Sequence, residues 1–339
     1  MNPEFYLAFE DRFRGSRDLI KDRLRFYLPF VAPLRDSCGL APWLDLGCGR
    51  GEWLELAGEW GVDAQGVDLD PAMSQACVTM GLKARSGDAI RHLKEAPSES
   101  LSAITGFHIA EHLPFGDLQA MIHEALRVLK PAGLLILETP NPENLMVGTW
   151  AFFLDPTHNK PLPPPLLSFA IEFAGFHRVK TVRLQDSPSL AERLDLGLAD
   201  VLNGVSPDYA IIAQKKADAP ELAHWGAVFD KEYGCTLDGL AVRYDERLER
   251  AHRLADQAWR GAQEADASIQ KLQWALQRAV ATAAEAQADA ASAREAAESA
   301  TAMARQAAAG LSDLRRSVSW RVTAPLRWVR RLGRRAPDA

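Results

Sequence analysis

The chain has 339 residues, of which 47% are hydrophobic and 25% charged, a composition typical of a folded protein rather than a disordered or fibrous one. The formal net charge is −6, yet the part from Arg315 onward contains eight arginines and one acid, so the preceding part carries −13. This distribution argues against nucleic-acid binding and favours a local anionic contact near the C-terminus. The four scattered cysteines have no metal-ligand or disulfide spacing, which indicates reduced thiols in the cytoplasm.

Residues 1–40 are expected to form a helical cap. Ser16 can cap a helix whose first turn contains Asp18, and apolar residues recur behind it at helical spacing. The arginines of this segment are expected on a solvated face, or alternatively against a carboxylate or phosphate near a site. The N-terminus lacks the features of a signal peptide, and no apolar run approaches the ~18 residues that span a membrane, so we expect neither feature.

A glycine-rich turn with the sequence LDLGCGRG occupies residues 44–51. Three glycines at alternate positions, between a strand and a helix, predict a tight turn whose unpaired backbone N–H groups face a ligand. The G-x-G-x-G spacing differs from the dinucleotide fingerprint and suits an adenosyl ligand with an amino-acid tail better than a pyrophosphate. The plainer alternative is an ordinary turn that is rich in glycine.

Strand and helix patterns alternate from about residue 42 to 214. Seven strands with crossover helices predict a doubly wound α/β sheet, in which ligands lie at the carboxyl ends of central strands. The prolines between Pro161 and Pro165 predict an irregular loop that is long enough to cover such a site. The expected strands are 42–46, 63–68, 83–87, 102–107, 133–138, 177–184 and 208–214.

Acidic residues close two successive strands of this pattern. Asp68, with Asp70 as the second choice, can accept hydrogen bonds from a ribose diol at the end of the second strand. Asp88 can accept one from an adenine amino group after the third strand. Either acid alone would more often be a turn residue, but the ordered series of glycine turn and two acids indicates a nucleoside ligand more strongly.

A long helix is expected after a linker or docking segment at 216–240. Residues 244–314 contain no proline, and apolar residues follow one another at alternating spacings of four and three. At ~1.5 Å per residue this helix would be roughly 100 Å long. We expect this helix to form a coiled coil in a homo-oligomer. The association should be weak, because alanine buries little area. A single alanine-rich helix is the alternative. The members of this seam other than alanine are Tyr244, Leu248, Ile269, Leu272, Leu276, Leu311 and Leu314.

The C-terminal tail combines tryptophan and aliphatic residues with many arginines. This composition is typical of an amphipathic helix at a membrane interface, where each basic residue near an anionic leaflet adds about 1 kcal/mol. A solvated basic tail and a partner-docking helix are the alternatives, and we expect 317–335 to bind an anionic membrane surface. The expected organisation is a cap at 1–40, a main domain at 41–215, a linker at 216–240, a coiled coil at 241–316 and a basic tail at 317–339.

The order of the motifs resembles that of class I S-adenosylmethionine-dependent methyltransferases over residues 40–214. The similar segments are LDLGCGRG at 44–51, GVDLDP at 66–71, GDA at 87–89, FHIAEHL at 107–113 and LKPAGLLILETPNP at 129–142. The resemblance implies a seven-stranded Rossmann-like sheet that ends in a reversed hairpin, with S-adenosylmethionine as the cofactor. It implies cofactor-binding roles for Asp45, Gly47, Cys48, Gly49, Gly51, Asp68, Leu69, Asp88, Ala89, Phe107 and His108.

Segments outside the main motifs resemble bacterial methyltransferases of surface-polysaccharide assembly, including O-antigen chain-terminating enzymes. These segments are FEDRFRGS at 9–16, LDPTHNKP at 154–161 and SWRVTAPL at 319–326. The resemblance implies a lipopolysaccharide O-antigen or other glycan acceptor, glycosyltransferase partners, and a peripheral location at the cytoplasmic face of the membrane. Some of those terminators also carry a kinase domain, for which we see no room, so direct methylation of a sugar hydroxyl is expected.

A sugar hydroxyl is a poor nucleophile at neutral pH, so a general base is expected. His112 and Glu111 follow the fourth strand, whereas His158 and Asp155 lie on the proline-rich loop. We expect His158 or His112 as the base, with Glu111 and Asp155 as further catalytic candidates. The plainer view is that Glu111 and His112 merely begin the next helix.

Residues 108–112 also spell H-x-x-E-H, a metalloprotease pattern. That pattern requires both histidines on one helical face, whereas His108 should end a strand, so we reject a protease. We expect no metal, although His108, Glu111 and His112 could hold a divalent ion as in some ubiquinone-type O-methyltransferases.

The sequence therefore favours an O-methyltransferase that acts on a surface glycan. A second hypothesis keeps the fold but makes the acceptor a small molecule such as a quinone or lipid precursor. A third is a non-catalytic scaffold for glycosyltransferases, against which the intact glycine turn and the two acids argue.

Overall fold

A seven-stranded sheet forms the centre of the first of two structural units, residues 1–251 and 252–339. The structure is a computed structural model that describes residue 12 and residues 15–332. The strand order is β3-β2-β1-β4-β5-β7-β6, with β7 antiparallel to both of its neighbours, so the predicted doubly wound sheet with a reversed last strand is confirmed. The strands are β1 (Trp43–Leu46), β2 (Ala64–Asp68), β3 (Ala84–Ser86), β4 (Leu101–Phe107), β5 (Leu129–Pro140), β6 (Arg178–Leu184) and β7 (Asp208–Gln214).

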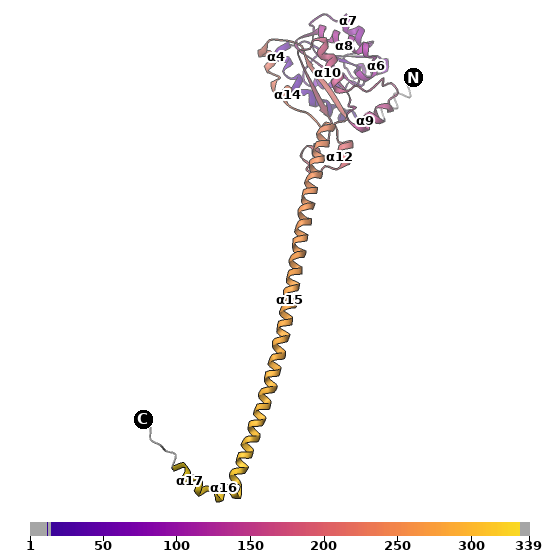
Figure 1. The fold of residues 1–339 in the computed structure, drawn as a ribbon. Coiled ribbons are helices and arrows are strands. Elements are labelled where there is room, and N and C mark those ends of the chain that lie inside the picture. Colours follow the sequence, from indigo (N-terminus) through magenta and orange to yellow (C-terminus); the bar gives the residue numbers. More distant parts are fainter. Residues whose placement is uncertain (1–11, 13–14, 333–339) are drawn as a thin grey trace. The chain divides into compact units, whose positions relative to one another are not determined.

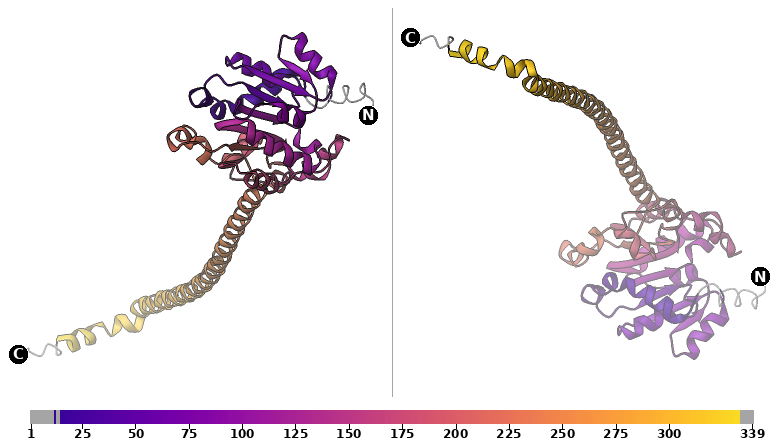
Figure 2. Two further views of the ribbon diagram at one scale, coloured as in Figure 1. Left: turned by 90° about the horizontal axis from the view of Figure 1, so that it is seen from above. Right: turned by 90° about the horizontal axis from the view of Figure 1, so that it is seen from below.

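The strands are apolar because helices cover both faces of the sheet (Figure 2). Alternate residues enter opposite cores: Ile104 of β4 packs with one set of helices and Ala103 with the other. The helices of the Ala103 face are α2 (Arg17–Leu24), η1 (Arg25–Tyr27), α3 (Leu28–Val31), α4 (Leu34–Cys38), α5 (Glu52–Glu59) and α6 (Pro71–Thr79). Those of the Ile104 face are α7 (Ala89–Glu95), α8 (Phe115–Val128) and α10 (Pro164–Ala174).

The N-terminal helices are part of the main core. The hydroxyl of Ser16 accepts a hydrogen bond from the Leu19 amide at 3.3 Å, so Ser16 caps α2 as predicted. Tyr27 and Phe30 are fully buried against the sheet. Residues 1–11 and 13–14 of the expected cap lie outside the described residues.

Of the two expectations for residues 216–240, a linker or a docking segment, the structure has the docked segment. It contains α13 (Ala219–Ala223) and α14 (Gly226–Asp230), and the Trp225 side chain between them is fully buried. Its indole Nε1 donates a hydrogen bond to the carbonyl of Phe30 at 2.6 Å. The segment docks on the N-terminal helices and belongs to the core of the first unit.

The segment between β5 and α10 covers the edge of the sheet where the glycine turn lies. It contains α9 (Leu145–Thr149) and η3 (Ala151–Leu154), followed by irregular chain. The predicted proline-rich loop is shorter than expected, because Pro164 and Pro165 form the first turn of α10.

Helix α15 (Leu237–Arg316) is a single helix of 80 residues (Figure 1). Its first turns pack within the first unit, where Leu240 joins a small core formed by α11 (Pro188–Glu192) and α12 (Leu198–Asn203). Tyr244, the first residue of the predicted seam, packs against this core, whereas residues 252–316 are exposed throughout.

Two short helices follow α15: α16 (Val318–Val322) and α17 (Ala324–Leu332). Residues 333–335 of the expected membrane-binding segment, and the rest of the tail to residue 339, lie outside the described residues. Among the helices of the described chain, none combines the length and the apolar character that crossing a membrane requires.

Candidate functional site

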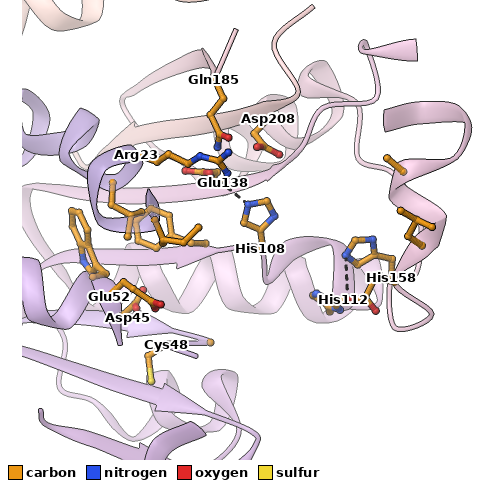
Figure 3. A pocket seen from close by; sticks show the side chains of 18 residues that line it. Arg23, Asp45, Cys48, Glu52, His108, His112, Glu138, His158, Gln185 and Asp208 are labelled. Carbon is orange, nitrogen blue, oxygen red and sulfur yellow. Dashed lines mark ion pairs between the residues drawn. The ribbon is translucent and has the colours of Figure 1, made fainter. Parts of the chain in front are cut away.

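A cavity of about 400 Å³ opens at the carboxyl ends of β1 and β4 (Figure 3). Its lining comes from the glycine turn, from helix α2, from the starts of α5 and β7, and from the covering segment after β5. The predicted site residues that line it are Asp45, Gly47, Cys48, Phe107, His108, His112, Asp155 and His158. Polar and aromatic lining residues that the sequence analysis did not assign to the site are Arg23, Glu52, Trp53, Glu138, Gln185 and Asp208.

The glycine turn has the predicted conformation but not the predicted hydrogen bonding. Gly47, Gly49 and Gly51 have φ angles of 68°, 48° and 82°, in the left-handed region that favours glycine. The amides of Gly47 and Cys48 both donate to the carbonyl of Val67, at 2.8 and 3.2 Å. The Gly49 amide donates to Asp68 Oδ2 at 2.8 Å, and the Gly51 amide to the Cys48 carbonyl at 2.9 Å. The expectation that these four amides await a ligand is therefore wrong, because the fold already uses them.

Two buried carboxylates and one indole line the cavity beside the turn. Asp45 Oδ1 accepts a hydrogen bond from the hydroxyl of Thr105 at 2.7 Å. Glu52 is paired with the guanidinium of Arg50 at 2.9 Å. Trp53 is 2% exposed, and its Nε1 has no hydrogen-bond partner among the described residues. A buried N–H without a partner is costly, so this atom is suited to donate to a bound ligand.

The predicted nucleoside-binding acids do not line this cavity. Asp68 is half-buried, and its two oxygens accept hydrogen bonds from the amides of Gly49 and Asp70, both at 2.8 Å. Asp88 is exposed and caps α7 by accepting from the Arg91 amide at 2.7 Å. Their roles remain predictions, as do those of the other cofactor residues outside the lining: Gly49, Gly51, Leu69 and Ala89.

His108 lies among carboxylates in an unusual backbone conformation. Its φ is 59°, and its side chain is 38% exposed. Nδ1 is 3.1 Å from Glu111 Oε1, and Nε2 is 3.6 Å from Glu138 Oε1. Burial by itself would lower the pKa of His108, but the two carboxylates outweigh it and raise the pKa well above its usual value. The two carboxylates therefore favour the imidazolium form of His108, which is not suited to act as a base.

Glu138 and Asp208 come to the same edge because β7 runs antiparallel to β5. Asp208 pairs with Pro140, so the first residue of β7 lies where β5 ends. The hydroxyl of Tyr27 donates to Glu138. Burial raises the pKa of Asp208 to about 6, although the nearby His108 opposes this. The sequence signal for Glu138 was an acid near the end of an otherwise apolar strand.

His112 and the covering segment meet through Thr157. The Thr157 hydroxyl oxygen is 2.9 Å from His112 Nδ1 and 2.6 Å from Asp155 Oδ1. Burial, the largest influence, lowers the pKa of His112, and the neighbouring His158 acts in the same direction. His112 is therefore an uncharged imidazole in the neutral pH range.

His158 lies beside His112, with the ring centroids 4.8 Å apart. Its Nδ1 is 2.6 Å from the carbonyl of Phe152, and its Nε2 is 3.9 Å from Asp155 Oδ2. The structure thus brings together His112, His158 and Asp155 of the predicted catalytic set. Glu111 lies behind the cavity, where its oxygens are engaged by His108 and by the hydroxyl of Thr139 at 2.8 Å.

Two further contacts fasten the covering segment to η2 (Ala110–His112). The backbone amide of Asn159 donates to the carbonyl of Glu111 at 2.8 Å, and its side-chain amide donates to the carbonyl of His112 at 2.6 Å. These two hydrogen bonds therefore connect the covering segment to the residues that follow β4.

Two groups of side chains in the described chain have metal-ligating atoms within 4.8 Å of one another. They are Glu111 with His112 and His158, and His108 with Glu138 and Asp208. The set weighed from the sequence, His108 with Glu111 and His112, is divided between them. Because His108 follows β4 and is not on a helix, the arrangement is not that of an H-x-x-E-H protease.

Comparison with known proteins gives a consistent result. A family model described as a methyltransferase domain matches residues 12–181. The chain is 33% identical to a SAM-dependent methyltransferase from Archaeoglobus fulgidus whose crystal structure is known, over 62% of this chain and 100% of that chain, with a TM-score of 0.55.

Two kinds of curated relatives also match. A probable S-adenosylmethionine-dependent methyltransferase of Mycolicibacterium smegmatis is 29% identical over 192 residues, 55% of this chain and 69% of the relative. A ubiquinone biosynthesis O-methyltransferase of Xanthomonas oryzae pv. oryzae is 31% identical over 119 residues, 34% of this chain and 48% of that enzyme. The chain therefore spans about half the length of the ubiquinone enzyme.

Proposed function

The chain belongs to the S-adenosylmethionine-dependent methyltransferases, and from this premise we propose that its acceptor is a hydroxyl group of a surface glycan. The protein is a methyltransferase enzyme whose methyl donor is S-adenosylmethionine. A non-catalytic scaffold is accordingly no longer the favoured hypothesis. The proposed acceptor is a glycan, the proposed partners are glycosyltransferases, and the proposed location is the cytoplasmic face of the membrane.

The residues beside the glycine turn fit the amino-acid part of this cofactor. When bound, S-adenosylmethionine supplies a methyl group on a positively charged sulfur, ready for in-line displacement. The buried carboxylates of Asp45 and Glu52 suit the ammonium group, and the unpartnered Nε1 of Trp53 suits the carboxylate. The Arg50 guanidinium that pairs with Glu52 holds that carboxylate in place.

The position of His112 at the cavity, beside Thr157 and His158, is the observation that carries the proposal of a hydroxyl acceptor. A hydroxyl must lose its proton as it attacks, and an imidazole that is neutral near pH 7 is suited to take it. His112 lines the cavity beneath a covering segment that also contributes Asp155 and His158. This arrangement can hold an acceptor oxygen and exclude water from it.

The arrangement of the rest of the chain supports a glycan at the cytoplasmic face of the membrane. A long exposed helix with an alanine-rich seam suits self-association and the docking of glycosyltransferases. Exposed Val322, Leu326 and Trp328 share two short helices with several arginines, a combination that suits an anionic lipid surface. These features favour modification or termination of a membrane-bound O-antigen-type glycan.

Incubation of the purified full-length protein with methyl-labelled S-adenosylmethionine and a glycan fraction tests the proposal. The glycan should come from cells that lack this enzyme, so that its acceptor positions are free. Label should appear in the polysaccharide fraction and be released with O-methylated sugar on acid hydrolysis. Label that is confined to other fractions, while the protein binds the cofactor, would overturn the glycan assignment.

A small-molecule acceptor is the second candidate, favoured by the similarity to the ubiquinone biosynthesis O-methyltransferase. The same incubation with a total lipid extract distinguishes the two. Label that partitions into the organic phase as a methyl ether would support a quinone or lipid precursor. In that case truncation after residue 251 should leave the methylation of this acceptor in cells unchanged.

A further inference from the structure

The Thr157 hydroxyl lies between a histidine and a carboxylate, although it has only one hydrogen to donate. Asp155 Oδ1 accepts hydrogen bonds from both the hydroxyl and the amide of Thr157, at 2.6 and 2.8 Å. A hydrogen bond to a carboxylate is stronger than one to a neutral imidazole, so the hydroxyl hydrogen belongs to Asp155. The remaining lone pairs of Thr157 Oγ1 face His112 Nδ1 at 2.9 Å.

The direction of the hydrogen bond from the Thr157 hydroxyl to Asp155 fixes the tautomer of His112. An oxygen that presents a lone pair requires an N–H opposite it, so Nδ1 of His112 carries the proton. A neutral imidazole has one N–H, which leaves Nε2 with its lone pair free. His112 lines the cavity, beside His158.

His158 and His108 are arranged differently. His158 Nδ1 must donate to the Phe152 carbonyl at 2.6 Å, and its Nε2 faces Asp155 Oδ2 at 3.9 Å. Both nitrogens of His108 face carboxylates. His112 is therefore the histidine at the cavity whose Nδ1 is held by a hydroxyl oxygen, whereas Nδ1 of His158 is held by a carbonyl and Nδ1 of His108 by a carboxylate.

We propose that His112 Nε2 is the atom that removes the acceptor's proton. Thr157 is the positioning residue: Asp155 fixes its hydroxyl, and the hydroxyl oxygen orients the His112 imidazole. The inference rests on the proposed hydroxyl acceptor. It selects between the two histidines that the sequence left open, and it gives a role to a threonine that carries no acid–base chemistry of its own.

The step balances with the groups that are present. The acceptor's proton moves to Nε2, and its oxygen forms the new bond to the methyl carbon. The bond from that carbon to sulfur breaks, and its electron pair remains on sulfur, which becomes neutral. The imidazolium then formed donates through Nδ1 to Thr157, whose hydroxyl donates to the Asp155 carboxylate, and the proton leaves to solvent.

The tautomer can be read directly in the free protein by long-range proton–nitrogen NMR with ¹⁵N-labelled histidine. The His112 signals are identified by their loss in His112→Gln. The wild type and Thr157→Ser should show Nδ1 protonated and Nε2 unprotonated, whereas Thr157→Val, which has no lone pair, should give a mixture. Thr149→Val, in the same covering segment but away from the cavity, is the matched control and should match the wild type. A protonated Nε2 in the neutral wild-type imidazole would overturn the inference.

Kinetics with the labelled glycan supply the second measurement. His112→Gln should lower kcat by roughly 10²–10⁴-fold, the usual contribution of a general base. Thr157→Val should lower kcat by about tenfold or more and move the acid limb of the pH–rate profile to lower pH, because the imidazolium loses its acceptor. Thr157→Ser, which keeps the hydroxyl, should have the wild-type kcat and the wild-type pH–rate profile. Cofactor affinity, measured by calorimetry, should stay unchanged in all three.

The outcomes separate this inference from the proposed function. If no glycan is methylated but His112 shows the predicted tautomer, the acceptor assignment fails and the positioning role of Thr157 stands. If the glycan is methylated and His158→Gln abolishes the reaction while His112→Gln does not, the assignment of the base to His112 is wrong.

Discussion

Trp53 brings a hydrogen-bond donor to the cavity where no described residue accepts it. Trp53→Phe keeps an aromatic ring beside Tyr27 and Phe107 and removes the five-membered ring that carries the N–H. If the N–H donates to the cofactor, the affinity for the cofactor should fall by roughly 10- to 150-fold, the equivalent of one hydrogen bond to a charged group. Isothermal titration with S-adenosylmethionine measures this change.

Trp60→Phe is the matched control for this prediction. Trp60 packs edge-on against Trp53, with the ring centroids 5.5 Å apart, but does not line the cavity. Its substitution should leave cofactor affinity within about twofold. Equal losses in the two variants would show that packing, and not the Trp53 N–H, determines affinity.

Asp208 gives the folded state a pH dependence of known sign. Its pKa is raised to about 6 by burial, with His108, Glu138, Arg23 and Glu111 as the charged groups that act on it. The folded protein therefore holds this proton more tightly than the unfolded chain, and the resulting stability is lost as the pH rises from about 4 through 6.

Asp208→Asn, which cannot titrate, should gain stability relative to the wild type between pH 4.5 and 7, by up to about 2 kcal/mol. Guanidinium unfolding at the two pH values gives this change. Asp63→Asn, at an exposed ion pair with Lys83, should show little change and serves as the control. A difference between Asp208→Asn and the wild type that is the same at both pH values would contradict the prediction.

The sequence identified site residues in or directly after the central strands β1 and β4. It missed side chains that helices and the reversed strand β7 bring to the cavity. Asp45 and His108 were predicted from the resemblance to class I methyltransferases, and both line the cavity. Arg23 comes from a helix whose arginines were expected mainly in solvent, and Asp208 from the start of a reversed strand. The pairing of the glycine-turn amides was also unpredictable, because it depends on how closely the turn approaches β2.

Among the secondary-structure elements, α13 and α14 were the least predictable and offer the sharpest test. Trp225 between them is fully buried and bonded to Phe30. Trp225→Ala should lower the free energy of unfolding by about 3–5 kcal/mol, because it leaves a cavity and an unpaired carbonyl. Thermal and guanidinium unfolding measure this loss.

Trp259→Ala on α15, where the side chain is 67% exposed, provides the comparison. Its effect on unfolding should stay within about 0.5 kcal/mol. A small effect of Trp225→Ala would instead mean that residues 216–240 behave as the linker that the sequence predicted.

The strands were predictable because their apolar runs are long and regular, and all seven occur within a few residues of their expected positions, apart from an earlier start of β5. Helices α13 and α14 each have five residues, too few for a helical period to appear. Trp225 and Phe229 stand in a short segment without a recognisable period, so the tertiary contacts with Phe30 show that they belong to the core.

For the whole molecule, self-association through the seam of α15 is a prediction that single-chain geometry does not test. Ile269, Leu272 and Leu276 form its most apolar part, and all three are more than half exposed. Leu272→Asp with Leu276→Asp should dissociate any oligomer, since each leucine contributes about 1.5–3 kcal/mol when buried. Gln270→Asp with Gln277→Asp adds the same charge off the seam and should leave the mass unchanged. Sedimentation equilibrium measures the mass of the particle in solution. A wild-type protein that is monomeric at all concentrations would contradict the coiled coil.

Membrane binding by the tail is the other prediction at this scale. In α17 the apolar residues Leu326, Trp328 and Val329 are exposed, and the guanidinium of Arg327 lies 3.5 Å from the Trp320 ring centroid. The full chain should co-sediment with phosphatidylglycerol-containing vesicles and less with pure phosphatidylcholine, and added salt should weaken this binding. Leu326→Asp with Trp328→Asp should abolish it. Equal binding to both lipid compositions would contradict an electrostatic contribution.

The attachment of the covering segment at Asn159 has a consequence for how such an enzyme could change its substrate. Asp155, Thr157 and His158 lie on one stretch between β5 and α10, and Asn159 fastens that stretch to the residues that follow β4. Replacement of this stretch by another from a related enzyme, with the Asn159 contacts and the hydrogen bond from Tyr209 to Leu162 kept, would change the lining of the cavity on one side only. If the proposed acceptor binds there, such grafts should change the acceptor preference while the residues beside the glycine turn stay the same.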